Sequence, residues 1–439
     1  MQRIEVKNLG PLKDVSLDIK DYMIFIGPQA SGKSTLAKLV WFFREFPNFL
    51  VNYYPGDLFG IHHFFESLIP KDRLQKDDSS KSKKALSAYF QNLEFADNLF
   101  TNNTQISLYY TDQLSIIVGL NKQVTVSDNL KILLESLNLI YEEAKTNFNA
   151  SKNKDDRLLI ARSLSFEIKK ILEANKLVNQ ENIFIPAARI IYALARDYRV
   201  GLNSTAQVRD DGFLDKFYSL LQDISGNIQK NRNRYFTDST EDSTLKSLLK
   251  NVLKGEVRFE NVNFEEKEKS FIPQILVENQ LIDLKEASSG QQESLWILLV
   301  VLYFLKEERK PSIIIEEPEA HLFPEAQRDL TYLISLLVNQ QGNQVLLTTH
   351  SPYILASLNN LLKAYTVGQM EKNKEAVGKI VDPLLWVDPA RVFVGYMENG
   401  EIKPILNPEL QQIEHDLLDN VSNDIMTKFD ELLEIQYNQ

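Results

Sequence analysis

The segment from Gly27 to Thr35 reads GPQASGKST and follows an apolar run from Met23 to Ile26. It fits the pattern G-x-x-x-x-G-K-[ST], in which small residues let successive backbone N–H groups face phosphate oxygens. In this pattern the lysine, Lys33, reaches the outer phosphates, and the hydroxyl of Ser34 coordinates Mg²⁺. The residues predicted to bind phosphate are Gly27, Pro28, Gln29, Ala30, Ser31, Gly32, Lys33 and Ser34. A chance glycine turn is the alternative, which the preceding strand and the helix expected over residues 33–44 disfavour.

Two adjacent carboxylates, Glu316 and Glu317, follow a second apolar strand, Ile313 to Ile315. At the carboxyl edge of a parallel sheet, Glu316 can bind Mg²⁺ through water and Glu317 can polarise an attacking water as general base. A glutamate pair at a strand end is, in isolation, commonly just solvated. Its co-occurrence with a phosphate-binding loop favours the catalytic interpretation.

Two weaker signals complete the set. Ser288, Ser289 and Gly290 directly precede an apolar helix and predict a helix N-cap, which can also bind an anion. His350 follows the strand Gln344 to Thr348. Alone, the first segment is more often a structural cap and the second a structural histidine, so both gain weight only from their order along the chain.

The elements that must position these segments alternate between strands and helices, which predicts an α/β fold with a largely parallel sheet near the chemistry. Alternating apolar residues between Gln105 and Val126 predict a small antiparallel meander, and helical spacing appears over Leu130–Ala144 and Leu158–Ala174. After His350, Ala364–Gly368 and Val392–Leu406 are predicted to complete the sheet. We expect residues 1–45 and 255–439 to form the α/β domain, and residues 46–254 a mainly helical inserted lobe that includes the meander.

Composition narrows the function classes. The chain has 439 residues, no cysteine and a net charge of −11, which excludes disulfides and thiolate zinc sites and argues against a broadly basic nucleic-acid coat. The apolar stretch from Ser294 to Leu305 is shorter than the about 20 residues that a membrane-spanning helix needs. No signal peptide pattern is present at the N-terminus. These features predict a cytoplasmic protein without membrane contact.

In this order, the four segments resemble the motif set of ABC ATPases: phosphate loop, signature motif, Walker B strand with catalytic glutamate, and switch histidine. The resemblance implies a P-loop NTPase head of ABC type that uses ATP and Mg²⁺. By the match, Lys33, Ser34 and Thr35 belong to the phosphate and metal loop, and Ser288 and Gly290 to the signature. Glu316 and Glu317 are the Walker B pair and His350 is the switch. The signature of one ABC chain closes on the nucleotide of another, so the resemblance also implies a homodimer or a higher homo-oligomer.

The run from Glu316 to Pro324, EEPEAHLFP, resembles the form found in OLD-type and related soluble bacterial ATPases, where the residues after the glutamate serve as a D-loop across the dimer. Three positions depart from the wider family pattern: Ala287 stands for the first signature leucine, Ser289 for its first glycine, and Phe323 where histidine is frequent. These departures suit the soluble branch better than transporters.

Several functions compete. A transporter subunit would not carry so long an insertion between Thr35 and Ser288, a zinc-hook protein needs heptads and a CxxC, and an OLD nuclease needs a TOPRIM domain after His350. We therefore expect the sensor or regulator of an anti-phage system, resembling PARIS-, Septu- and retron-type ATPases. Such a protein works with a separately encoded nuclease or toxin and answers a nucleic-acid or phage-protein trigger. A RecF-like DNA-repair clamp is the alternative.

Two further segments keep two interpretations each. Phe184–Arg189, FIPAAR, resembles a stretch common in the soluble group and is either functional or a strand end followed by a helix with an exposed arginine. Residues 229–244 are predicted to form a loop. Within it Lys230, Arg232, Arg234 and Tyr235 are either solvated, which we favour, or contact phosphates and bases.

Overall fold

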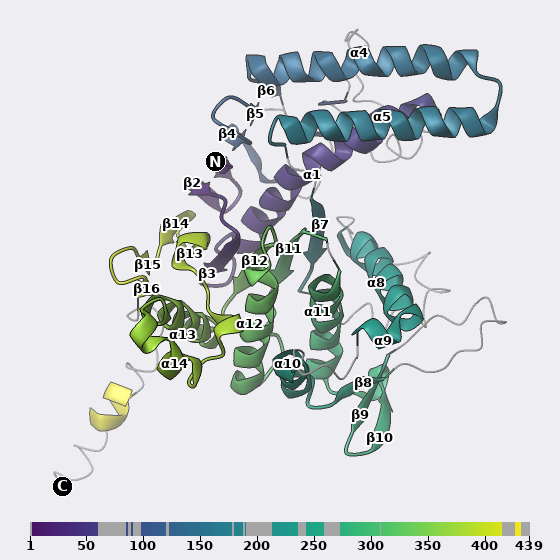
Figure 1. Ribbon diagram of the computed structural model, residues 1–439. Helices are drawn as coiled ribbons and strands as arrows, with labels where there is room; N and C mark the ends of the chain where they lie inside the picture. Colours follow the sequence, from purple (N-terminus) through teal and green to yellow (C-terminus); the bar gives the residue numbers. More distant parts are fainter. Residues whose placement is uncertain are drawn as a thin grey trace. The chain divides into compact units, whose positions relative to one another are not determined.

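The computed structural model describes residues 2–59, 85–86, 89–90, 98–119, 123–177, 180–187, 189, 213–235, 243–258, 273–307, 309–414 and 426–431 (Figure 1). The chain divides into two compact units. The first comprises residues 1–19, 28–183 and 397–402, and the second residues 20–27, 184–396 and 403–439. This grouping differs from a division at residues 46 and 254, and the predicted domain boundaries stay a prediction.

The first unit contains an antiparallel sheet with the strand order β6-β5-β4-β1-β2. Its strands are β1 (Arg3–Leu9), β2 (Leu12–Asp18), β4 (Phe100–Tyr109), β5 (Ser115–Val118) and β6 (Val124–Val126). The predicted meander is thus confirmed, and β4 also pairs with β1, where Ile4 lies opposite Leu108. Ile4 and Val6 are fully buried, as the period-2 pattern of β1 requires.

Three long helices accompany this sheet: α1 (Lys33–Leu58), α4 (Asp128–Ala150) and α5 (Lys154–Ala174). The Ser127 hydroxyl accepts from the Leu130 N–H at the start of α4, and the Asn153 side chain caps α5 in the same way. These caps fix where the two helices begin, and the helices form an antiparallel hairpin with a short turn (Figure 1). Leu164, Ile168 and Leu172 form the buried stripe of α5, which packs against both α1 and α4.

The second unit is built on a parallel sheet in the order β13-β3-β12-β11-β7, which confirms the α/β prediction. Its strands are β3 (Tyr22–Ile26), β7 (Glu181–Ile185, of which the last two residues belong here), β11 (Pro311–Glu316), β12 (Gln344–Thr349) and β13 (Val392–Glu398). Thr349 pairs with Ile26, and Glu316 pairs with Thr348. The carboxyl ends of β3, β12 and β11 therefore meet at one sheet edge.

The described helices of the second unit are α8 (Phe213–Lys230), α9 (Arg232–Tyr235), α10 (Ser243–Leu253), α11 (Ser289–Lys306), α12 (Pro324–Asn339), α13 (Pro352–Gly368) and α14 (Glu371–Gly378). One of them, α11, is apolar from Leu295 to Leu305. Because α11 packs against α8, α10 and α12, apolar residues on all its sides are buried. Of the helices that the structure describes, none is long and apolar enough to cross a membrane.

The remaining elements are short. A hairpin-based sheet contains β8 (Glu256–Arg258), β9 (Gln274–Val277) and β10 (Gln280–Asp283). The strands β14 (Glu401–Pro404), β15 (Leu406–Asn407) and β16 (Gln412–Ile413) follow β13. Residues 426–431 are helical.

Two sequence predictions about the backbone are wrong. Ala364–Gly368 is not a strand but the last turns of α13, because buried Leu358, Leu361 and Leu362 continue the helical spacing up to it. The predicted loop at residues 229–244 is helical in α8, α9 and the start of α10, while residues 236–242 lie outside the described part of the chain.

Two residues of this segment, Arg234 and Tyr235, contact the C-terminal end of helix α11. Arg234 donates from Nη2 to the carbonyl of Lys306 at 2.7 Å, and its Nη1 lies 3.1 Å from Oε1 of Glu307. The buried Tyr235 donates its hydroxyl to Glu307 at 2.5 Å. The last carbonyls of a helix need partners, and Arg234 supplies one. For Arg234 and Tyr235 these contacts correct the prediction of solvated side chains.

Candidate functional site

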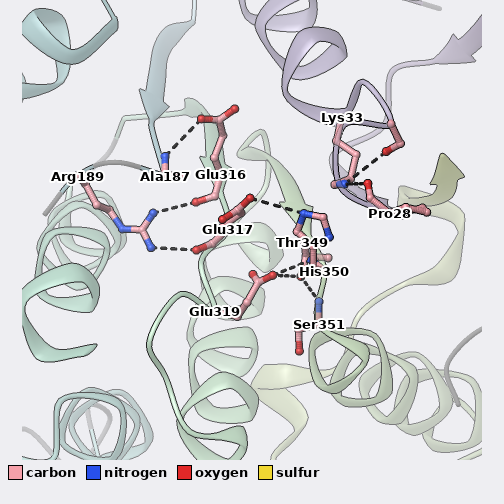
Figure 2. A network of polar contacts seen from close by, with 11 residues as sticks. Pro28, Lys33, Ala187, Arg189, Glu316, Glu317, Glu319, Thr349, His350 and Ser351 are labelled. Carbon is pink, nitrogen blue, oxygen red and sulfur yellow. Dashed lines mark hydrogen bonds and ion pairs between the residues drawn. The ribbon is translucent and has the colours of Figure 1, made fainter. Parts of the chain in front are cut away.

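The predicted phosphate loop has the backbone of an anion cradle. Gly27, Ala30 and Gly32 have φ angles of 153°, 57° and 98°, which turn their peptide groups away from extended or helical geometry. Pro28, Gln29 and Ala30 are exposed, so the loop opens to solvent. Lys33 donates from Nζ to the Pro28 carbonyl at 2.7 Å (Figure 2). The ammonium group therefore lies over its own loop, where phosphate oxygens can replace a neutral carbonyl.

Gly32 is required at the last turn of this loop for two reasons. Its φ of 98° is costly for any residue with a Cβ atom, and a Cβ there would lie 2.6 Å from Cδ2 of Leu12. Helix α1 starts immediately afterwards, with the Leu36 N–H bonded to the Gly32 carbonyl at 2.9 Å. The N-terminus of α1 therefore adjoins the loop, and the helix dipole favours an anion at that end.

In the second unit, β11 ends in the two predicted carboxylates. Glu316 is 7% exposed, and its Oε2 accepts a hydrogen bond from the Ala187 N–H at 3.3 Å. The next residue, Glu317, turns sharply with a φ of 43°, and its N–H donates to the Thr348 carbonyl at 2.9 Å. The turn separates the two side chains, so that Glu316 is enclosed and Glu317 is about half exposed, at 44% of its side chain.

His350 lies beside Glu317, as its place at the end of β12 predicts. The His350 Nε2 is 3.6 Å from Glu317 Oε1 (Figure 2). Glu319 fixes this arrangement because its Oε1 accepts from the Thr349 hydroxyl at 2.8 Å and from the His350 N–H at 2.7 Å. The resemblance places Glu319 in the segment expected to serve as the D-loop, and it does not predict these two bonds.

Of the two interpretations of Phe184–Arg189, the structure excludes the one with an exposed arginine, because Arg189 is fully buried. Its side chain is 0% exposed and donates to the carbonyls of Glu316 at 2.8 Å, Glu317 at 3.0 Å and Pro186 at 3.1 Å. On its other side it reaches Glu293 of α11, at 3.2 Å to the carbonyl and 3.1 Å to Oε2. The segment after β7 is therefore part of the site.

For both Arg189 and Glu293, burial and the charge of the partner shift the pKa in opposite directions. Burial lowers the pKa of Arg189, and the surrounding carboxylates, Glu293 first among them, raise it again. Burial likewise raises the pKa of Glu293, while Arg189 and then His321 lower it. A guanidinium stays protonated in proteins, so Arg189 places a positive charge beside the Glu293 carboxyl group inside the protein.

The predicted signature segment starts helix α11. Ser288 is exposed and forms a capping box with Gln291, whose side chain also accepts from the Ser288 N–H at 3.1 Å. Gly290 is buried, and a Cβ there would lie 2.6 Å from the carbonyl oxygen of His321. The helix start is thus packed closely onto the turn that follows Glu317.

Oxygen donors suited to Mg²⁺ are present in both units. The Ser34 hydroxyl is exposed at the start of α1, and the Glu316 carboxylate is enclosed at the end of β11. Hydroxyl and carboxylate oxygens are ligands that this ion prefers, so the chemistry of each residue, taken by itself, fits Mg²⁺. The structure brings Glu316, Glu317 and His350 together in the second unit, while Lys33, Ser34 and Thr35 belong to the first.

These features define a P-loop ATPase with an α/β fold. The family model described as AAA ATPase domain matches residues 1–355, so the chain belongs to the AAA ATPase domain family and is an ATPase. A comparison with curated proteins finds no match.

Solved structures similar to the chain include SMC head domains. The SMC head bound to the C-winged helix domain of ScpA is 13% identical, with 92% of this chain and 96% of that chain covered and a TM-score of 0.42. The SMC head domain from Thermotoga maritima is 10% identical, with 92% and 98% covered and a TM-score of 0.35. An SMC head with an extended coiled coil, bound to the C-terminal domain of ScpA derived from Pyrococcus furiosus, is 11% identical, with 92% and 96% covered and a TM-score of 0.37.

Proposed function

We propose that the chain is an ATP-driven switch of the ABC type, in which Glu317 is the general base and His350 the switch residue. The observation that carries this proposal is the 3.6 Å approach of His350 to Glu317 at the sheet edge where β3 also ends. Glu317 can take a proton from a water that attacks the γ-phosphate, and His350 is close enough to orient either of them.

The nucleotide is ATP, bound with Mg²⁺. Lys33 and the backbone of residues 27–32 bind its phosphates, and Ser34 and Glu316 bind the metal, the latter through water. When bound there, Mg²⁺ would neutralise charge on the phosphate oxygens. The enclosure of Glu316 and the exposure of the loop support this division of roles.

The sites are completed between two chains. Ser288 is exposed at the N-terminus of α11, where the helix dipole and free N–H groups favour the phosphates of a nucleotide held by a second copy. The protein is therefore a homodimer or a higher homo-oligomer in its ATP-bound state.

The biological role is that of a cytoplasmic sensor in an anti-phage system with a separately encoded effector. The EEPEAHLFP form supports this role, because it resembles that of soluble defence ATPases. Arg234 and Tyr235, which could have served a DNA-binding clamp, are engaged at the end of α11. This cluster therefore gives no support to the RecF-like alternative.

A phage challenge tests the role. Cells that express the chain with its neighbouring gene should resist infection, and Lys33→Ala should abolish resistance while protein levels stay equal. ATP-dependent binding of the purified chain to gapped or double-stranded DNA, without any protection from phage, would reject the sensor role in favour of the clamp.

A further inference from the structure

Arg189 donates four hydrogen bonds to three segments of the second unit. A guanidinium carries five N–H groups in a fixed plane. Nη1 donates to the Glu316 carbonyl and Nη2 to the Glu317 carbonyl (Figure 2). Nη1 also donates to the Pro186 carbonyl, Nε donates to the Glu293 carbonyl, and Nη2 faces Glu293 Oε2. One side chain thus joins the end of β7, the end of β11 and helix α11.

The contacts of Arg189 at the end of β11 involve the carbonyls of Glu316 and Glu317, which lie on either side of the Glu317 Cα atom. Glu317 has a φ of 43°, a conformation that costs a residue with a side chain free energy and persists only where neighbours enforce it. Its N–H is fixed by the Thr348 carbonyl and its carbonyl by Arg189. Both peptide groups of Glu317 are therefore held, and this sets the direction of its carboxylate.

The same residue fixes the signature helix to this turn. Glu293 lies one turn inside α11, beyond Ser288 and Gly290, and its side chain is 4% exposed. Because Arg189 contacts both its carbonyl and its carboxylate, α11 cannot shift along β11 without breaking buried charged contacts.

We propose that Arg189 is a positioning residue for hydrolysis, which holds the Glu317 turn in its reactive geometry and couples it to the start of α11. The inference rests on the proposed function of Glu317. Arg189 lies behind the turn, bonded to its carbonyls, and acts on the reaction only through Glu317. Lysine cannot replace it, because a single ammonium group cannot reach four carbonyls and a carboxylate.

Two variants separate positioning from folding. Arg189→Lys retains the charge opposite Glu293 but loses the planar fork. The double variant Arg189→Met with Glu293→Met removes both buried charges, which avoids leaving one unpaired. We expect both to bind ATP within about threefold of the wild type and to lose kcat by about tenfold or more, since small misplacements of a catalytic group are costly. The double variant should melt at a higher temperature than Arg189→Met alone.

Thermal stability and kcat, measured on the same variants, distinguish a positioning role of Arg189 from a purely structural one. A double variant that regains both thermal stability and wild-type kcat would overturn the proposal, and so would an Arg189→Lys enzyme with unchanged kcat. If neither variant folds, Arg189 is a folding residue and the proposal is rejected. Glu317→Gln is measured in the same series: if it hydrolyses ATP like the wild type, the proposed function fails, whereas an inactive Glu317→Gln beside fully active Arg189 variants rejects only this inference.

Discussion

The Nε2 atom of His350 lies 3.6 Å from Oε1 of Glu317, although the two residues come from the ends of different strands. The parallel register of β11 and β12 brings them together, because Glu316 pairs with Thr348 and each chain then turns at the same edge. At this distance the carboxylate and the imidazole can both contact the same water molecule.

His350→Ala should therefore lower kcat by about 10- to 100-fold, because it removes a polar group that orients the base or the transferred phosphate. ATP affinity should change little, since the phosphate loop is untouched. Steady-state ATPase kinetics with equilibrium binding of a fluorescent ATP analogue measures both. A variant with weak binding and normal kcat would assign His350 to nucleotide binding.

We expect Glu319 to support ATP hydrolysis through one side-chain oxygen, Oε1. Its Oε1 accepts from both Thr349 and the His350 N–H, so Glu319→Gln retains an acceptor and should keep most of the activity. Glu319→Leu removes it and should reduce kcat by about tenfold, because His350 is no longer fixed. Glu325→Leu, at an exposed position in the first turn of α12, is the control. Equal rates for the Gln and Leu variants would show that this bond does not support catalysis.

Gly290 should tolerate no side chain. Alanine would place a Cβ 2.6 Å from the His321 carbonyl oxygen, and overpacking of this kind costs about 1–3 kcal/mol. Gly226→Ala in α8 is a matched control, since a Cβ there meets nothing within 4 Å and alanine favours the helix. Thermal unfolding should show a loss of stability for Gly290→Ala alone. Equal melting temperatures would mean that the α11 start and the turn at His321 separate easily.

Much of the second unit was predictable because its signals are local. Short local patterns of about ten residues or fewer predict the strand Ile313–Ile315, the capped helix after Ser288 and the strand before His350. The carboxyl ends of parallel strands then lie at one edge of the sheet. The strand predicted at Ala364–Gly368 is wrong because a short apolar run fits a strand as well as the end of a helix.

The pairing of Arg189 with Glu293 was not predictable. A charged residue at the head of an apolar helix calls for a counter-charge, but its partner lies 104 positions away in the chain and in another segment. Nothing in the FIPAAR run says that its arginine turns inward, because the acceptors are backbone carbonyls, which have no signature in the sequence. The Glu319 contacts escaped for a similar reason, since they depend on the turn geometry after Glu317.

Shared sites can be tested by complementation. Ser288→Arg should block closure on an opposing nucleotide, and Lys33→Ala should weaken ATP binding in its own loop. Each variant alone should be inactive. A 1:1 mixture should regain about a quarter of wild-type activity, because half of the dimers are mixed and each mixed dimer has one intact site of two. Continued inactivity, with chain exchange demonstrated, would count against sites shared between chains.

The most direct test of the account is the Glu317→Gln variant, measured for ATP binding, ATP hydrolysis and oligomeric state in one experiment. Glutamine retains the shape of the side chain but cannot accept the proton of the attacking water. We predict wild-type ATP affinity, a loss of kcat of about 100-fold or more, and an ATP-bound dimer on size-exclusion chromatography. Glu375→Gln, at an exposed position of α14, should behave like the wild type. A Glu317→Gln protein that hydrolyses ATP at the wild-type rate would contradict the assignment of the general base and, with it, the proposed mechanism.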